Sequence, residues 1–334
     1  MGIFGAIQSP ADHRDYIYGQ MVPVGTLPPR YVLPEVHPVR KQEYGNCVGQ
    51  AAAGIKEYQE AKNYPGIRPR LSPVYVYGEC KRQDGIPDTE GTYPRTAMAV
   101  LLKQGVCLES TMPESTQTHP YRVPAASQKA HDEAKQFVIG AYARIQTLAE
   151  IKQAIAREGP AMGAAMVCEN FIRPEPGGFI PMPEGAMMGG HAVTVTGWDD
   201  TLTHTYRQPY RGKRTFTGFL RVRNSWGVEW GDRGYCWIPH ELFHSRLDVG
   251  MPYWMESWSS VDVILPPKDA RQIVIVPGQI TANVDGVDVP LDQPAEVHSR
   301  THRTLVPLRF IAEHMGWHVH WDGVRVILSQ PNRG

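Results

Sequence analysis

A change in sequence pattern near Gly159-Pro160 constrains the fold most strongly. Before this point helix signals dominate, and helices are expected after Asn46, from Ser72-Pro73, from Pro94 to Gly105, and after the capping-box pattern Thr147 to Glu150. Beyond it, short β-branched or aromatic runs between Gly and Pro loops predict strands at 161–167, 191–198, 218–224 and 234–238. The pattern therefore predicts an α+β architecture, with a helical lobe followed by a β-rich lobe.

The same signals divide the chain into four parts. These are an irregular, Pro- and Gly-rich arm at 1–35, the helical lobe at 36–145, the β-rich lobe at 146–265, and a small α+β module at 272–330 after a linker at 265–272. In the module, Asp-Gly pairs at 285–286 and 322–323 predict two hairpins, and 307–316 predicts an amphipathic helix. The apolar residues offered for its core are Val284, Val287, Leu308, Ile311, Val319, Trp321 and Val326.

The composition excludes several classes of partner. Lys plus Arg and Asp plus Glu both number 34, so no overall charge attracts nucleic acid or an acidic membrane surface. No apolar run approaches the about 18 residues that span a bilayer, and the start of the chain lacks the pattern of a signal peptide. We expect no nucleic-acid partner and no membrane insertion. The compartment stays open, with a weak preference for the cell envelope or the exterior.

Cys47 is the cysteine whose position matters for chemistry. None of the five cysteines forms a CxxC pair, so neither a zinc site nor a disulfide framework is expected. A lone free cysteine is more often a small buried hydrophobe than a nucleophile. Cys47, however, falls in the first turn of a helix after Asn46, where unpaired N–H groups and the helix dipole stabilise a thiolate. The other four cysteines are interpreted as structural.

Three further residues could complete the chemistry that a thiolate requires. His191 follows two glycines and begins a strand, so its ring could hold the thiol proton. Asn224 ends another strand, where its amide oxygen could accept a hydrogen bond from His191 Nδ1 while Trp226 shields that bond from water. Gln42 could supply an amide donor to the oxyanion. Together with Cys47, these residues indicate nucleophilic catalysis.

The order Gln42, Cys47, His191, Asn224 and the segment NSWGVEWGDRGY at 224–235 resemble the papain family of cysteine proteases. The interval from Cys47 to His191 falls within the about 130–150 residues typical of that family. Over about residues 30 to 260, this resemblance implies a two-lobed fold with the active site between the lobes. It also implies a cysteine endopeptidase that hydrolyses a peptide or protein substrate through an acyl-enzyme, with no cofactor and no metal.

The resemblance suggests where a substrate binds. The GTYP segment at 91–94 matches the family stretch that lines the pocket for the second residue before the cut. The resulting substrate-binding candidates are Gly91, Tyr93, Pro94, Gly190 and Trp226. Tyr93 could equally be a core residue.

The chain also departs from the family pattern. The usual Cys-Gly-Ser-Cys-Trp is replaced by Tyr-Gly-Asn-Cys-Val at 44–48, so the first half-cystine is absent, and Gly190 replaces a frequent acidic residue. Only the short arm precedes the protease part, where a longer inhibitory prodomain is usual. These departures indicate a disulfide-poor, bacterial type of protease without ordinary zymogen control.

The last part of the chain carries a second resemblance. VDGVDVPL, RTLVPLRFIAEHMG and VHWDGVRVIL are similar to the small domain named for the N-terminus of copper amine oxidases, which implies an accessory docking role and a possible cell-envelope ligand. The name implies neither copper nor oxidase activity. Histidines also gather here, but no carboxylate or cysteine completes a metal-ligand spacing, so we assign no metal to His298, His302, His314, His318 and His320.

Two other function classes stay open. The chain could be a catalytically silent papain-fold binding or scaffold protein, although the intact Cys47, His191 and Asn224 argue against this. It could also be a cell-wall peptidase or amidase, a class that does not explain Gln42 or the segment at 224–235.

A basic insertion separates His191 from Asn224. Residues 203–218 include Arg207, Arg211, Lys213 and Arg214, and they predict an extended basic hairpin. The hairpin is either a plain solvated surface, or it overhangs the leaving-group side of the active site and favours acidic residues there.

Overall fold

The computed structural model describes most of the chain up to residue 261 and shorter segments beyond it. The described residues are 3–22, 25–208, 212–261, 273–275, 280–284, 287–291, 293–294, 296–297, 304–305, 307–314, 318–321 and 326–329. Two compact units divide the chain, residues 1–264 and residues 265–334, and each is considered by itself. Within the described ranges, no helix is both long and apolar enough to cross a membrane.

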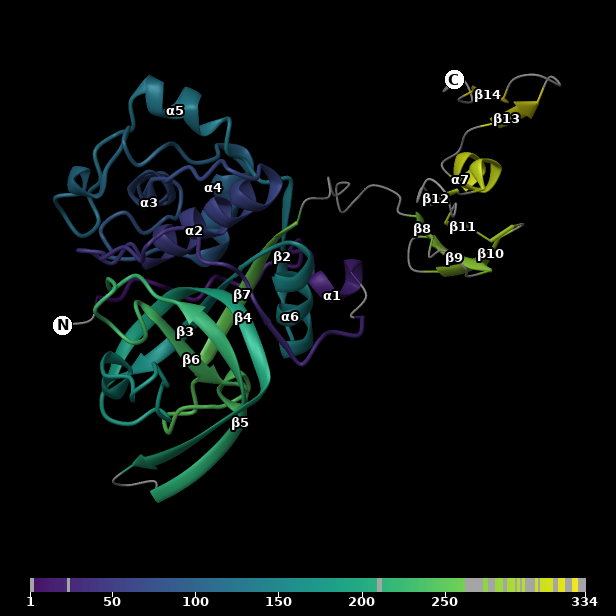
Figure 1. The fold of residues 1–334 in the computed structure, drawn as a ribbon. Helices are drawn as coiled ribbons and strands as arrows, with labels where there is room; N and C mark the ends of the chain where they lie inside the picture. The colour runs from purple at the N-terminus through teal and green to yellow at the C-terminus, as the bar shows by residue number, and fades with distance from the viewer. Residues whose placement is uncertain are drawn as a thin grey trace. The chain divides into compact units, whose positions relative to one another are not determined.

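The first unit has a helical lobe above a β lobe (Figure 1). The helical lobe contains α2 (Cys47–Asn63), α3 (Pro73–Lys81), α4 (Pro94–Lys103), α5 (Gln128–Ala134) and the 3-10 turn η1 (Glu114–Thr116). The predicted start signals act as expected, because Ser72 Oγ accepts the N–H of Tyr75 at 3.0 Å and proline takes the first position of both α3 and α4. The helices predicted in this lobe are confirmed.

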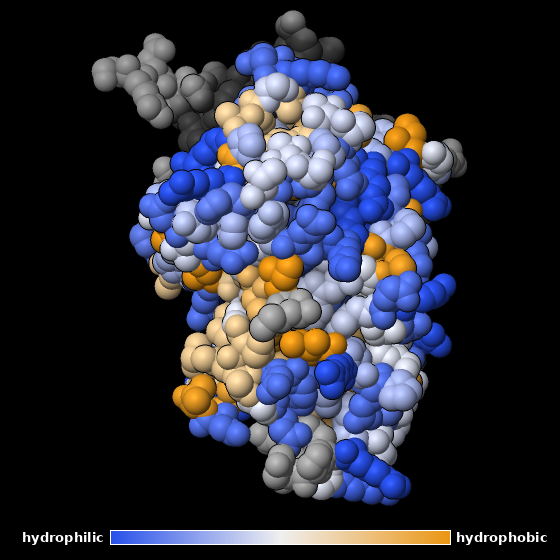
Figure 2. Space-filling model, turned by 90° about the vertical axis from the view of Figure 1, so that its left-hand side faces the viewer, coloured by the Kyte–Doolittle hydropathy of each residue, from blue (hydrophilic) through white to orange (hydrophobic). Residues whose placement is uncertain are grey.

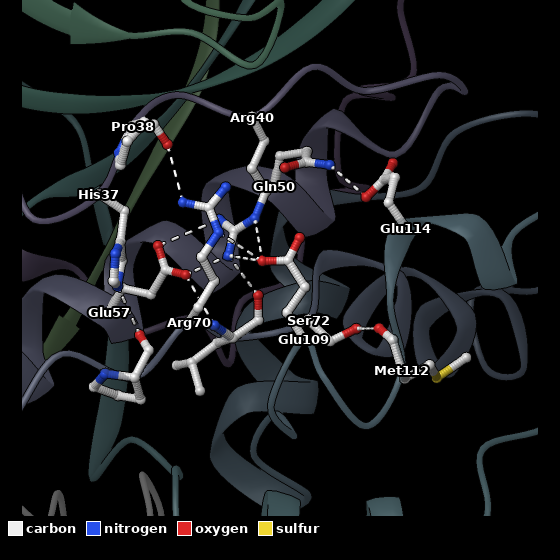
Figure 3. Close-up of polar contacts among 12 residues, drawn as sticks. His37, Pro38, Arg40, Gln50, Glu57, Arg70, Ser72, Glu109, Met112 and Glu114 are labelled. Carbon is white, nitrogen blue, oxygen red and sulfur yellow. Dashed lines mark hydrogen bonds and ion pairs between the residues drawn. The ribbon is translucent and has the colours of Figure 1, made fainter.

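A buried charge cluster anchors the chain segment that leads to the site (Figure 3). The Arg40 guanidinium contacts the carboxylates of Glu57 on α2 and Glu109, and it donates to the carbonyl of Leu71 at 2.7 Å. Arg70 donates to the same Glu109 carboxylate at 2.7 Å. Buried charges are tolerated only when they are paired and hydrogen-bonded, so this cluster fixes the segment around Arg40 against α2.

The β lobe is one antiparallel sheet with short helices around it. Its elements are α1 (Tyr18–Met21), β1 (Arg30–Val32), β2 (Ala141–Ile145), α6 (Leu148–Arg157), β3 (Ala161–Cys168), η2 (Glu169–Ile172), β4 (Met187–Gln208), β5 (Gly212–Arg223), β6 (Tyr235–Pro239), η3 (His240–Phe243) and β7 (Trp254–Val261). The strand order is β2-β7-β3-β4-β5-β6, and β1 pairs with β4. Thr147 Oγ1 accepts the N–H of Glu150, so the predicted cap is present. The Glu150 carboxylate accepts the N–H of Gln146 and not that of Thr147, so the reciprocal bond of a capping box is shifted by one residue.

The core runs without a break from the helices to the sheet. Buried residues of α2, α3 and α4 pack in one cluster with Ala164 of β3, Ala192 of β4 and Trp258 of β7. The arm is irregular apart from α1 and β1, and its first described residues run between the two lobes (Figure 1). On the face that bears this end of the chain, hydrophobic surface gathers at the middle and over the lower half, whereas the upper half is largely hydrophilic (Figure 2).

The second unit is a small α+β module. Its elements are β8 (Ile273–Ile275), β9 (Thr281–Val284), β10 (Val287–Pro290), β11 (Glu296–Val297), β12 (Thr304–Leu305), α7 (Leu308–His314), β13 (His318–Trp321) and β14 (Val326–Ser329). The strands on either side of each Asp-Gly pair are antiparallel partners, β9 with β10 and β13 with β14. The Asp-Gly pairs themselves, and the linker at 265–272, lie outside the described residues.

The core expected for this module is partly corrected. Ala282, Val284 and Phe310 are buried together, and Ile311 packs against them. Val287 is 65% exposed, so the prediction that it is a core residue was wrong. It is the first residue of β10 and shares a strand face with Val289, which packs against this cluster, but the buried cluster does not extend as far as Val287. The side chains of Leu308, Val319, Trp321 and Val326 lie outside the described part.

Candidate active site

Cys47 is the first residue of the central helix α2 and points toward the β lobe. Its Sγ accepts a hydrogen bond from the backbone N–H of Ala192 on β4 at 3.4 Å, and its exposed fraction is 0%. The Asn46 side chain does not cap the helix as expected, because it donates to Glu114 and Gln117 instead. The first-turn N–H groups therefore have no cap from Asn46, and their partial positive charge favours a thiolate.

His191 on β4 and Asn224 after β5 form a direct hydrogen bond. His191 Nε2 lies 2.7 Å from Asn224 Oδ1, which also accepts the N–H of Ser225 at 2.8 Å. Oδ1 only accepts, so Nε2 carries the proton. Nδ1 is buried and has no hydrogen-bond partner in the described structure. The expectation that Nδ1 would bond Asn224 was wrong about the nitrogen, and the observed arrangement leaves Nδ1 available as a base.

Aromatic rings enclose the imidazole of His191. The Trp226 ring lies 4.7 Å from it between centroids, tilted by 32°. Phe171 of η2 lies 6.0 Å from the His191 ring and 5.6 Å from the Trp226 ring. These rings exclude water from the His191–Asn224 bond and so strengthen it. Sequence reasoning missed Phe171, because an isolated aromatic residue in an irregular segment carries no periodic signal.

Gln42 is buried beside the site. Its Nε2 donates to the carbonyl of Tyr44 at 2.8 Å and to that of Ile3 in the arm at 3.3 Å, while its Oε1 accepts from Ser225 Oγ. Its backbone N–H donates to the carbonyl of Ser225 at 2.8 Å. The Gln42 amide is therefore held by Ser225, the residue after Asn224. It also donates to the carbonyl oxygen of Ile3 in the arm, which lies between the lobes.

The start of the arm covers Cys47 and His191. The Phe4 ring contacts the His191 and Trp226 rings edge-on, at centroid distances of 6.1 and 5.7 Å. Gly5 lies so close to the loop before Cys47 that a Cβ on it would be 1.8 Å from the carbonyl oxygen of Gly45. Zymogen control of the ordinary kind was not expected, because the arm is shorter than a usual prodomain. This short arm nevertheless covers both Cys47 and His191.

The arm is held by backbone hydrogen bonds from both lobes. The N–H groups of Gly5 and Ala6 donate to the carbonyl of Gly190 at 3.0 and 2.9 Å. On the other side, Thr92 N–H donates to the Gly5 carbonyl at 2.9 Å, and the Thr92 carbonyl accepts from Ile7 N–H at 3.0 Å. Thr92 thus binds an extended chain as the edge of a sheet does. Sequence reasoning named its neighbours but not Thr92 itself.

The other predicted substrate-binding residues lie around this edge. Gly91 has a φ of +95°, and a Cβ there would lie 2.4 Å from the Gly5 carbonyl oxygen, so glycine is required for both its conformation and its space. Tyr93 is half-buried and precedes α4, where the buried Pro94 takes the first position. The structure therefore brings Gly91 and Gly190 to opposite sides of the arm.

Burial keeps Cys47 and His191 neutral while the arm covers them. Burial raises the pKa of the Cys47 thiol to about 12, against the opposing effect of backbone N–H donors that include those of Ala192 and Gly5. Burial also lowers the pKa of His191 to about 4, and the hydrogen bond to Asn224 opposes that shift. A thiolate-imidazolium pair is therefore disfavoured while the arm covers the site.

Residues 30–246 match the family described as papain family cysteine protease. The chain belongs to the papain family of cysteine proteases. It is therefore a cysteine peptidase of the hydrolase class, and the expected α+β, two-lobed papain-like fold is confirmed.

Individual papain-like proteins resemble this chain over most of its first unit. The crystal structure of xylellain, a cysteine protease from Xylella fastidiosa, is similar with a TM-score of 0.62 and 25% identity, covering 77% of this chain and 96% of that one. An uncharacterised peptidase C1-like protein of Acanthamoeba polyphaga mimivirus is 24% identical over 269 residues, 76% of this chain and 78% of that protein. A gut-specific cysteine proteinase of Caenorhabditis elegans is 29% identical over 211 residues, 57% of this chain and 60% of that protein.

The second expected resemblance is also confirmed. Residues 252–328 match the family described as copper amine oxidase N-terminal domain. Among the residues that the structure describes, no group of three or more His, Cys, Asp or Glu side chains is placed to hold a metal ion. His314 stacks on Phe310 and contacts its carbonyl at 2.8 Å. His298 and His302, and the side chains of His318 and His320, lie outside the described part.

The basic hairpin forms as predicted but does not lie where we expected. β4 and β5 pair from Thr203↔Thr217 to Gln208↔Gly212. The paired strands extend from the β lobe on the side away from the helical lobe (Figure 1). The hypothesis that this hairpin overhangs the site between the lobes was therefore wrong. The exposed Arg207 and Lys213 face solvent, Arg214 pairs with Glu241, and Arg211 lies outside the described residues.

Proposed function

We propose that this chain is an endopeptidase in which Cys47 is the nucleophile, His191 the general base and acid, and Asn224 the group that orients the imidazole. The observation that carries the proposal is the 2.7 Å bond from His191 Nε2 to Asn224 Oδ1. It leaves Nδ1 as the unprotonated nitrogen, while Cys47 Sγ is bonded to the N–H of Ala192, the residue next to His191. None of the five cysteines is in a disulfide, which supports the bacterial, disulfide-poor type.

The proposed reaction uses these groups in two steps. The thiol proton passes to His191 Nδ1 and the sulfur attacks the scissile carbonyl carbon. The tetrahedral oxyanion accepts hydrogen bonds from the backbone N–H of Cys47 and from Gln42 Nε2. His191 then protonates the leaving amine, the C–N bond breaks and a thioester remains. A water molecule, deprotonated by His191, attacks the thioester, the C–S bond breaks, and the carboxylic acid and the free thiol are released.

Hydrolysis on this scheme requires the arm to leave. Phe4 and Gly5 occupy the place beside His191 and Cys47 that a substrate must reach, so the arm and a substrate exclude each other. Gly91, Tyr93, Pro94, Gly190 and Trp226 are the proposed substrate contacts once the arm has moved. We further propose that the second unit is a docking module for a cell-envelope ligand, because it forms a separate compact unit.

The test compares Cys47→Ala with Cys236→Ala, which removes another fully buried cysteine. Hydrolysis of a mixed peptide library should be abolished by Cys47→Ala and retained by Cys236→Ala, with both proteins folded by circular dichroism. Full activity of Cys47→Ala would contradict the assignment. Cleavage of peptidoglycan but not of peptides by the unaltered chain would favour the cell-wall enzyme. Peptide binding without turnover would favour the silent scaffold.

A further inference from the structure

Lys81, the last residue of α3, buries its ammonium group against the loop at 84–92. Its side chain is 5% exposed and that of Asp84 is 0% exposed. Nζ lies 2.9 Å from Asp84 Oδ2, and it also donates to three backbone carbonyls, those of Ile86 at 2.7 Å, Thr89 at 2.8 Å and Gly91 at 3.0 Å. A buried ammonium is stable only when its charge and its donors are satisfied. The loop therefore folds around Lys81.

The end of this loop is the edge that binds the arm. Gly91 is held on both of its polar groups, because its N–H donates to Tyr77 Oη at 2.9 Å and its carbonyl accepts from Lys81. Thr92 Oγ1 donates to Asp84 Oδ2 at 2.9 Å. These bonds fix Gly91 and the side chain of Thr92 from the side of α3. The backbone N–H and carbonyl of Thr92 are not used by them and can bind an extended chain between the lobes, as they bind the arm.

The loop has no covalent tie to the segment that carries Cys47. None of the five cysteines is in a disulfide, and Tyr44 stands where the papain family usually has a cysteine. The Glu90 carboxylate instead accepts the N–H of Gly45 at 2.7 Å, which joins the loop to the residues just before Cys47. Polar contacts from Lys81, Asp84 and Glu90 therefore hold this wall of the site.

We propose that Lys81 is a positioning residue for substrate binding, which rests on the proposed peptidase function. Paired with Asp84, its ammonium holds the Thr92 backbone in place as the edge on which the residues before the cut are bound. Lys81 itself does not touch the substrate. Its loss weakens binding of every substrate that reaches Thr92 and spares the chemistry at Cys47.

Comparing a long with a short substrate distinguishes weaker substrate binding at Thr92 from a general loss of structure, which would lower activity on both. The full chain with Lys81→Met is compared on two substrates, an N-acyl tripeptide amide that reaches Thr92 and a single-residue ester with a free amino group that does not. We expect the ratio of the two kcat/KM values, tripeptide over ester, to fall about 10- to 100-fold in Lys81→Met, as for the loss of one or two buried hydrogen bonds. The arm competes with both substrates, so it cancels from the ratio.

Lys56→Met is the matched control, since Lys56 is also buried and pairs with Glu60 within α2 at 2.7 Å, away from the loop. It should leave the ratio unchanged. Hydrogen exchange supplies a measurement independent of turnover: residues 84–92 should exchange about 10-fold faster or more in Lys81→Met but not in Lys56→Met. If Lys81→Met does not fold, Asp84→Asn should give the same changes in smaller size.

Equal losses on both substrates, or unchanged exchange at 84–92 in a folded Lys81 variant, would overturn the proposal. A failure of the proposed function looks different, because the unaltered chain would then show no hydrolysis that depends on Cys47.

Discussion

The Nε2–H of His191 donates to Oδ1 of Asn224 across 2.7 Å, and both side chains are buried. This bond sets the tautomer, so that Nδ1 is the unprotonated nitrogen, which takes the Cys47 proton in the proposed reaction. In Asn224→Ala the acceptor is lost and a buried N–H is left unpaired. We expect kcat to fall about a hundredfold or more and the free energy of unfolding to fall by about 1–3 kcal/mol. Steady-state kinetics and urea unfolding check both, and an unchanged kcat would contradict the orienting role.

Displacing the arm should activate the full chain. A Cβ on Gly5 would lie 1.8 Å from the Gly45 carbonyl oxygen, so Gly5→Ala cannot keep the arm in place. Overpacking of this kind costs about 1–3 kcal/mol, which predicts a rise in kcat/KM of about 5- to 150-fold. Gly25→Ala is the matched control in the same arm, since a Cβ there would lie 3.8 Å from its nearest neighbour. Equal rates for the two variants would mean that the arm does not limit activity.

Acid should weaken the covered state. Burial lowers the pKa of His191 to about 4 in this state, so the ring binds fewer protons than in an open state with its ordinary value near 6.5. The covered state therefore keeps its stability above about pH 6.5 and loses it as the pH falls toward 4, by on the order of 3 kcal/mol in total. An NMR titration should give a His191 midpoint near 4 in the unaltered chain and a higher one in Gly5→Ala. Equal midpoints would contradict this account.

Removing the second unit should leave catalysis unchanged. Every catalytic candidate and Lys81 lie within residues 1–264, which form one compact unit. A chain that ends at residue 264 should cleave a short peptide within about twofold of the full-length rate, because truncation removes no group that binds or activates the substrate. Side-by-side kinetics are the measurement. A truncated protein that is folded but inactive would mean that the second unit contributes to the site.

The sequence was sufficient to predict the elements that local patterns specify. The starts of α3 and α6, the strands β3 to β6 and the long β4–β5 hairpin follow from capping residues, proline, and period-two runs. The strands β1, β2 and β7 of the same sheet were not predicted. The family resemblance supplied Cys47, His191 and Asn224, which the structure brings together although they are distant in the chain.

Other features depend on contacts that no local pattern encodes. Asn46 was expected to cap α2, but its amide is drawn to the Glu114 carboxylate and Gln117 from another part of the chain. The position of Gly5 over Cys47 depends on Gly45, Thr92 and Gly190, which approach only in the folded chain. Lys81 carried no signal either, since a single lysine at a helix end is usually solvated.

Mapping a thiol-trapping epoxide on the full chain shows directly whether Cys47 is the reactive nucleophile. All five cysteines are buried, so exposure alone does not favour any of them. One adduct is expected, on Cys47, which forms faster in Gly5→Ala than in Gly25→Ala and is lost in His191→Ala, because His191 takes the Cys47 proton in the proposed reaction. Modification of Cys80, Cys107, Cys168 or Cys236 in preference to Cys47, or a Cys47 adduct that forms equally fast without His191, would contradict it.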